Sequence, residues 1–366
     1  MRKRLSLLLV LLFLLTLAGC GAAPYDKKVG VFYYSFDDAF LTNVRIALND
    51  EFASRRIEYE NFDAANHQDT QLAQIRAAAA EGFDVLLVNT VASNSPDTAR
   101  EILSLAGGVP VVFFNRSIEA PDAGPEVLLG NPNAAFVGTR SGEAGHLQGE
   151  LIGQYVTAHF SEMDRNGDGE VTYAMFKGSE QSQECVLRTR YSVEDANAAL
   201  AAAGFRPLRY FDAESARHYQ VDPENKWSDD AAFAFLTEDL ARFNEANGNM
   251  IELVICNNDD MAVGAIAALQ AAGFNQRHPD RTIPVFGIDA TAVARELINE
   301  GLMTGSVLQD SGAMARAMAE VAERLLGGAS ARDAVKKAAA LDENSSAGED
   351  SPQKLLLAYA PYEVQR

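Results

Sequence analysis

A short loop near the middle of the chain carries side chains that could bind a metal ion. The stretch "DRNGDGEVTYAM" places side-chain oxygens at alternate positions, at Asp164, Asn166 and Asp168, and Gly169 follows them. This spacing matches the first half of an EF-hand calcium loop, in which a Glu at position twelve completes the coordination. Position twelve here is Met175. The sequence therefore predicts either a last ligand from elsewhere in the chain or a polar turn that binds no metal.

A second group of candidate residues follows the apolar runs that we expect to form strands. These runs end in Asp37, Asp38 and Phe40, in Asn89, in Asn115 and Arg116, in the stretch 257–260 ("NNDD"), in Asp289, and in Gln309 and Asp310. Helix capping explains one Asp or Asn per turn, but the doublets and the aromatic residue favour a ligand site. Asp, Asn and Arg groups bind hydroxyls in pairs, and aromatic rings cover apolar ring faces, which is the chemistry that a sugar requires.

The elements that must position these residues alternate between short apolar runs and helical patterns. Strands are expected at 28–36, 58–62, 84–90, 109–115, 134–139, 171–178, 207–212, 251–257, 283–289 and 304–309, with an extended segment near 354–364 and a surface loop at 341–353. Such alternation predicts α/β structure with doubly wound parallel sheets, whose ligands bind at the carboxyl ends of strands. The pattern restarts near residue 140, and 366 residues exceed one ordinary core, so we expect two similar lobes with a ligand cleft between them.

The N-terminal segment is typical of an exported protein. Three basic residues precede an apolar run from Leu5 to Ala18, which is shorter than the roughly 20 residues of a membrane span. The run ends in "LAGC", which resembles the lipobox of bacterial lipoproteins. That resemblance implies a signal peptide at 1–19, a lipid on Cys20 and a linker at 20–27. We therefore expect an extracytoplasmic protein that is lipid-anchored to the bacterial cell membrane.

Composition excludes several classes of function. The net charge of −20 repels phosphate backbones, so nucleic-acid binding is not expected. Cys185 and Cys256 show no metal-binding spacing, and we expect two free thiols, with a disulfide as the alternative. The sequence has neither a GxSxG elbow nor a phosphate-binding GxxxxGK[ST] loop, so we expect no enzyme activity.

Five segments together resemble one family along nearly the whole exported chain. "VGVFYYSFDDAF", "VPVVFFN", "DRNGDGEV", "IELVICNNDDMAVGA" and "IPVFGIDA" are similar to the bacterial galactose/glucose-binding proteins, the substrate-binding components of ABC sugar importers. The resemblance implies the periplasmic binding protein type I fold, in which the chain crosses three times between lobes. The crossings match positions near 139, 309 and 359. One lobe then comprises 28–139 plus 310–359, and the other 140–309 plus 360–366.

The resemblance also implies a set of sugar contacts. Phe40 and Trp227 match the two aromatic residues that sandwich the sugar, and the matching polar contacts are Asp38, Asn115, Arg188, Asn258 and Asp289. Three contact positions depart from the family pattern: Ser182 replaces a His, Glu184 an Asp and Gln309 an Asn. A monosaccharide is therefore expected, with galactose or glucose as the first choice and a different pentose or hexose as the alternative.

Two biological settings fit these residues. The first is delivery of the sugar by a monomeric binding protein to an ABC permease in the cytoplasmic membrane. The second is a sensory lipoprotein that presents its sugar to a chemoreceptor or membrane kinase. A repressor of similar architecture would need an N-terminal DNA-binding helix-turn-helix, where this chain has its signal segment.

The first loop now gains a candidate for its missing ligand. Met175 lies within an apolar strand and cannot bind a metal, but Glu252 begins "ELVIC", a strand that is expected beside it. The family resemblance agrees, because its members use a distant Glu at the matching position. The predicted structural Ca²⁺ site therefore contains Asp164, Asn166, Asp168, Glu170 through its carbonyl, Thr172 and Glu252. This site lies at the amino ends of the strands, away from the sugar.

Overall fold

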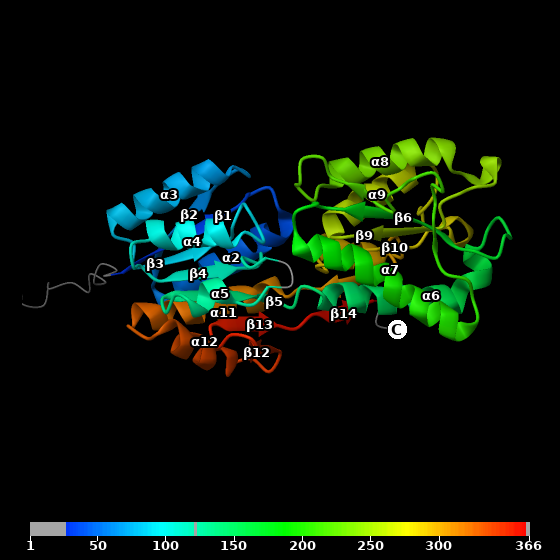
Figure 1. Ribbon diagram of the computed structural model, residues 1–366. Helices are drawn as coiled ribbons and strands as arrows, with labels where there is room; N and C mark the ends of the chain where they lie inside the picture. The colour runs from blue at the N-terminus through cyan, green and yellow to red at the C-terminus, as the bar shows by residue number, and fades with distance from the viewer. Residues whose placement is uncertain (1–26, 121–122, 364–366) are drawn as a thin grey trace, which may run out of the picture.

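The computed structural model describes residues 27–120 and 123–363, which form two α/β lobes (Figure 1). The predicted signal peptide, Cys20 and most of the predicted linker lie outside the described residues. In the described ranges, no helix is both long enough and apolar enough to cross a membrane.

The first lobe contains a seven-stranded sheet in the order β12-β13-β5-β4-β3-β1-β2. All its strand pairs are parallel except the antiparallel pair at the β12 edge. Its strands are β1 (Lys28–Tyr33), β2 (Glu58–Asp63), β3 (Val85–Val88), β4 (Val111–Phe114), β5 (Ala134–Thr139), β12 (Ser345–Ala347) and β13 (Lys354–Leu357). Its helices are α2 (Ala39–Arg55), α3 (Gln68–Glu81), α4 (Pro96–Leu105), α5 (Glu126–Leu129), α11 (Ser311–Leu326) and α12 (Ala331–Ala339).

The second lobe contains a parallel sheet in the order β10-β9-β6-β7, with β8 also paired to β6. Its strands are β6 (Thr172–Lys177), β7 (Arg209–Tyr210), β8 (Gln220–Val221), β9 (Leu253–Cys256) and β10 (Val285–Phe286). Its helices are α6 (Glu143–Met163), α7 (Gln183–Ala203), α8 (Asp229–Arg242), α9 (Asp259–Ala271) and α10 (Ala292–Asn299), with short 3₁₀ turns at Glu245–Asn247 and Pro279–Arg281.

Both sheets are covered on two faces, as continuous apolar strands require. In the first lobe, α2, α11 and α12 pack on one face and α3, α4 and α5 on the other. In the second lobe, α6 packs against α7 and α8 against α9. The four residues of β3 and the four of β9 are fully buried, which confirms the predicted doubly wound α/β architecture.

The chain passes between the sheets at three places. β5 belongs to the first sheet and α6 to the second lobe; β11 (Ser306–Leu308) precedes α11; and β13 precedes β14 (Ala360–Tyr362). β11 and β14 pair with each other as an antiparallel two-stranded sheet. The C-terminal helices α11 and α12 therefore lie with the N-terminal half of the chain, as the orange segments beside the blue and cyan ones show (Figure 1).

Two local predictions have clear outcomes. Cys185 and Cys256 are both free and fully buried, which confirms the prediction of two thiols. The expected loop at 341–353 is wrong in part, because it contains β12. This strand is polar and only half-buried at the edge of the sheet, so it lacks the apolar pattern by which sequence reveals a strand.

Candidate functional site

One cavity between the lobes is lined by all ten residues that the sequence assigned to a sugar. In this structure it has a volume of about 40 Å³, and it lies at the carboxyl ends of the strands of both sheets. The lining residues are Tyr34, Asp38, Phe40, Asn115, Arg116, Ser182, Glu184, Arg188, Trp227, Asn258, Asp289 and Gln309. Tyr34 and Arg116 were not among the predicted sugar contacts. Tyr34 directly follows β1, and Arg116 follows Asn115, the first polar residue after β4.

The first lobe contributes one aromatic face and a fixed carboxylate. Asp38 caps α2, accepting the N–H of Leu41 at 2.8 Å through Oδ1 and the Tyr34 hydroxyl at 2.7 Å through Oδ2. Phe40 lies in the first turn of the same helix and is almost buried. The guanidinium of Arg116 stacks 3.8 Å from the centre of the Tyr34 ring. Capping and site lining are thus not alternatives at Asp38, because one side chain does both.

The second lobe contributes the other aromatic face through a tightly constrained loop. Trp227 has a left-handed backbone (φ +60°), and its carbonyl accepts the Asn258 side-chain amide at 3.1 Å. Its indole packs on Gly178, where an added Cβ would lie 2.2 Å from a ring carbon. Asn258 also caps α9 through the N–H of Met261. The sequence alone left the role of Trp227 open. The structure places it in the cavity wall, in a position that is possible because its neighbour Gly178 has no side chain.

A buried arginine occupies the base of the cavity. Arg188 donates to the carbonyl of Asn257 at 2.8 Å and to Oε1 of Gln309 at 3.0 Å, and it lies 3.9 Å from Asp289. Burial raises the pKa of Asp289 well above its ordinary value, although Arg188 acts in the opposite direction. Among the described residues, the buried Nε of Arg188 has no hydrogen-bond partner. The site thus contains a free N–H donor that suits an acceptor oxygen of a ligand.

The three positions that depart from the family pattern are joined to their neighbours. Ser182 donates to Oε2 of Glu184 at 2.7 Å, and Oε1 of Glu184 accepts the N–H of Ser117 from the other lobe at 3.4 Å. Gln309 donates to Oδ1 of Asn115 at 2.9 Å. The longer side chains of Glu184 and Gln309 therefore bridge groups that lie on different segments.

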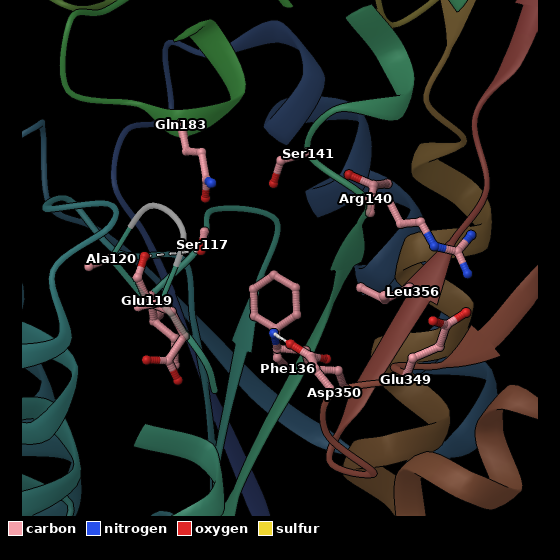
Figure 2. A pocket seen from close by; sticks show the side chains of 14 residues that line it. Ser117, Glu119, Ala120, Phe136, Arg140, Ser141, Gln183, Glu349, Asp350 and Leu356 are labelled. Atoms are coloured by element: carbon pink, nitrogen blue, oxygen red, sulfur yellow. Dashed lines mark hydrogen bonds and ion pairs between the residues drawn. The ribbon is translucent and has the colours of Figure 1, made fainter. Parts of the chain in front are cut away.

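A second pocket lies along the same boundary between the lobes but is more open. Its volume is about 450 Å³. Figure 2 shows the Phe136 ring in this pocket, with Ser141 and Gln183 across from it. Lys354 pairs with Asp350 at 2.6 Å, and Glu119 accepts the N–H of Val127 at 3.0 Å. We therefore assign the ligand to the smaller cavity, where a buried donor is free.

The predicted metal loop closes on Glu252 as expected. Oε1 of Glu252 accepts the N–H of Arg165 at 2.8 Å, and Oε2 accepts the N–H of Thr172 at 2.9 Å. Burial raises the pKa of Glu252, and the nearby Asp164 carboxylate raises it further. The Thr172 hydroxyl donates to the carbonyl of Met250 at 2.5 Å. The buried Glu252 carboxylate and the hydrogen bond from Thr172 to Met250 therefore both hold the loop to the segment that precedes β9.

The other loop side chains are used within the loop or paired with arginines. Asp164 accepts the N–H groups of Asp168 and Gly169, and Arg209 lies 3.1 Å from Asp168. No three carboxylate, imidazole or thiol groups in the described ranges converge as a metal site. The three carboxylates of the predicted set, Asp164, Asp168 and Glu252, therefore do not converge in this structure, although oxygen ligands of these kinds suit Ca²⁺.

Two α/β lobes that enclose a polar cavity at the carboxyl ends of their strands define a two-lobed ligand-binding protein. The chain matches the periplasmic binding protein domain over residues 29–330, and it belongs to that family. Its homologues are substrate-binding transport proteins rather than enzymes.

Individual relatives resemble the chain over most of its length. The D-galactose/methyl-galactoside binding periplasmic protein of Haemophilus influenzae is 30% identical over 338 residues, which cover 91% of this chain and 92% of that protein. A solute binding protein from Bacillus halodurans with bound myo-inositol has a TM-score of 0.66 at 23% identity and covers 93% of this chain and 96% of that one. One from Clostridium phytofermentans with bound β-D-glucose has a TM-score of 0.67 at 17% identity, with coverages of 92% and 94%.

Proposed function

We propose that this protein is the substrate-binding component of an ABC sugar importer and captures one monosaccharide between its lobes. The observation that carries the proposal is the cavity, where Phe40 and Trp227 from opposite lobes flank carboxylates, amides and the buried Arg188. The unpaired Nε–H of Arg188 supports it, since a sugar hydroxyl oxygen can accept a hydrogen bond from it. The galactoside-binding relative supports it further, because its likeness spans nearly the whole chain.

D-galactose or D-glucose is the first choice of ligand. The galactoside-binding relative favours D-galactose. The alternative is a different pentose or hexose presented by a sensory lipoprotein. The three departures from the family pattern, Ser182, Glu184 and Gln309, favour a different sugar, because their hydrogen bonds determine which groups one side of the cavity offers to a ligand. Neighbours of the same fold hold myo-inositol or β-D-glucose, so the architecture accepts different polyhydroxylated rings.

Capture proceeds by closure of the lobes. Each lobe supplies one aromatic face and several polar groups, so a ligand contacts the full set only when the lobes meet. Binding therefore shifts the population toward the closed form. The closed form is the shape that the permease recognises. Capture of the sugar involves no covalent change in it.

Isothermal titration with D-galactose, D-glucose, D-ribose, D-xylose and myo-inositol tests the proposal directly. We expect one of the four sugars to bind at one site per chain. If none of them binds, sugar capture is wrong. Binding of myo-inositol alone would replace the monosaccharide by a cyclic polyol.

We also propose a structural Ca²⁺ in the loop from Asp164 to Thr172. The ligands are the side chains of Asp164, Asn166, Asp168 and Thr172, the Glu170 carbonyl and Glu252. The closeness of half-buried Asp164 to buried Glu252 supports the proposal, because two neighbouring carboxylates repel each other unless a cation lies near. Bound there, Ca²⁺ supplies positive charge that fixes the loop to β9; its site lies away from the sugar.

The cellular setting follows from the family and the N-terminal segment. Periplasmic binding proteins act outside the cytoplasmic membrane, and we propose that a lipid on Cys20 holds this one to the membrane surface as a monomer. The run "LAGC" supports the anchor. Metabolic labelling with a fatty acid tests it, and a Cys20→Ser variant that still carries label would contradict it.

A further inference from the structure

Two loops at the rim of the cavity cross from the first lobe to the second through asparagine side chains. Asn94, between β3 and α4, donates through Nδ2 to the carbonyl of Gln181 at 2.8 Å. Asn66, between β2 and α3, donates through Nδ2 to the carbonyl of Glu224 at 3.3 Å. Neither asparagine lines the cavity.

Both asparagines have the same unusual backbone conformation. Asn66 has φ +61° and Asn94 has φ +54°, a left-handed region that Asn tolerates better than most other residues. Each of the two side chains leaves its own loop to reach a carbonyl of the second lobe. The two rim loops therefore present an amide donor toward the opposite lobe in the same way.

Each asparagine is tied by its own N–H to a segment of the cavity wall in the first lobe. The N–H of Asn94 donates to the carbonyl of Ser117 at 2.7 Å, and the N–H of Ser117 in turn reaches Glu184. The N–H of Asn66 donates to the carbonyl of Tyr34 at 2.6 Å. Both rim contacts are thus continuous, through hydrogen bonds, with residues that line the cavity.

The acceptor in each case lies on a loop of the second lobe that carries a cavity residue. Gln181 directly precedes Ser182 and lies three positions before Glu184, and Glu224 lies three positions before Trp227. Asn94 therefore holds the loop that positions Glu184, and Asn66 holds the loop that positions Trp227. The two contacts restrain two different parts of the ligand site.

We propose that Asn66 and Asn94 form an interlobe clasp, a pair of positioning residues that hold the Trp227 and Glu184 loops over the ligand. This inference rests on the proposed capture of a sugar by lobe closure. Because the clasp contacts exist only when the lobes meet, they stabilise the closed form and slow release of the ligand. Entry into the open form does not involve them.

The left-handed backbone supplies a clean set of variants. Asn94→Gly and Asn66→Gly keep the backbone conformation and remove the donor. Asn94→Asp keeps the shape but places an acceptor against the Gln181 carbonyl. Ala65→Gly is the matched control, since Ala65 is exposed, is also left-handed (φ +48°) and directly precedes Asn66.

Stopped-flow release of D-galactose and small-angle scattering of ligand-free protein give two separate readouts. We expect Asn94→Gly to raise the release rate about fivefold, as the loss of one hydrogen bond predicts. Asn94→Asp should raise it more, Asn66→Gly less, and Ala65→Gly should not change it. Association rates should stay within about twofold in every variant.

The scattering measurement uses ligand-free protein, so it tests the clasp independently of which sugar binds. We expect the Asn66→Asp/Asn94→Asp double variant to have a larger radius of gyration than the unmodified protein without ligand. If unmodified protein does not bind D-galactose, the choice of ligand fails and the clasp is judged on scattering alone. An unchanged radius of gyration, or an unchanged release rate in the double variant, overturns the clasp.

Discussion

The two edges of the second lobe's sheet carry the same kinds of residue and use them differently. At the carboxyl edge, Asn258 and Asp289 face the cavity, with Arg188 as the nearby cation. At the amino edge, Asp164 and Glu252 accept backbone N–H groups of a single loop. Acidic and amide side chains thus surround an open cavity at one edge and organise their own backbone at the other.

The difference shows that environment, rather than residue type, decides what such clusters do. Burial raises the pKa of Asp259, which lies behind the cavity, to about 7, although Ser306 and Thr291 both donate to it. At the amino edge, Asp168 is more exposed and is paired with Arg209. The carboxyl edge therefore retains groups that a ligand can satisfy, and the amino edge retains two carboxylates that a cation can stabilise.

The largest effect is expected from a change at the carboxyl edge. Trp227→Ala removes one aromatic face of the cavity, and we expect the Kd for the bound sugar to rise about 100-fold, or about 2.7 kcal/mol, in isothermal titration. Phe233→Ala is the control, because Phe233 is an exposed aromatic on α8, the helix that follows Trp227. Equal affinities of Trp227→Ala and unmodified protein would remove Trp227 from the site.

A change at the amino edge should affect stability and leave the affinity for sugar nearly constant. We expect chelation of Ca²⁺ to lower the Tm of the unmodified protein by roughly 4 °C, as loss of a ligand at about 100 times its Kd predicts. The Glu252→Gln variant should have the same Tm with and without chelator. Differential scanning calorimetry measures both.

Glu245→Gln is the matched control for the amino edge. Glu245 is an acid that pairs with Arg165 of the same loop, but it lies outside the proposed ligand set. It should keep the full response to Ca²⁺. A Glu252→Gln variant that kept that response as well would contradict the assignment of Glu252.

The sequence predicted the fold and the cavity better than the contacts that cross between the lobes. Alternating buried strands and helices leave a strong pattern. Asn115 directly follows β4, and Asp38 and Asp289 lie within five residues of the ends of β1 and β10. Tyr34 and Arg116 carry the same signal, since each lies beside a strand end. Arg116 was among the strand-end candidates but not among the contacts implied by the family, and Tyr34 was not singled out.

The rim asparagines could not be predicted in this way. Asn66 and Asn94 lie in ordinary polar turns, and their roles depend on a left-handed backbone and on a partner lobe that is far away in sequence. β12 was missed for a related reason, because its pairing is set by its neighbour β13 rather than by its own apolar pattern. Sequence patterns report burial within one element, and these features depend on contacts between elements.

A third carboxylate sharpens the comparison, because it is buried without either a ligand cavity or a metal loop. Asp239 on α8 accepts the Gln220 side-chain amide at 3.3 Å through Oδ1. Among the described residues, its Oδ2 and the Oε1 of Gln220 have no partner. A proton on Oδ2 gives that oxygen a hydrogen to donate to Oε1, so one proton accounts for both unpaired acceptors. The acid and the amide then form a two-bond pair between β8 and α8.

The pH dependence of stability tests this pairing. Burial raises the pKa of Asp239 to about 7, with Glu238 and Asp212 adding to the effect and Arg242 opposing it. The folded protein thus binds the proton more tightly than the unfolded chain, so the contribution of Asp239 to stability falls as the pH rises from about 4 to about 7. Asp239→Asn supplies a permanent amide donor in place of the proton.

We therefore expect Asp239→Asn to match the unmodified protein near pH 4 and to exceed its free energy of unfolding at pH 8 by roughly 2 kcal/mol. Urea denaturation at both pH values measures this difference, and the exposed neighbour variant Glu238→Gln, which removes only one of the smaller contributions to the raised pKa, should give a much smaller difference. A variant that is less stable than the unmodified protein at pH 8 would show that Asp239 acts as a charged group. A buried acid of the second lobe would then need a cation, as the amino edge does, rather than a proton.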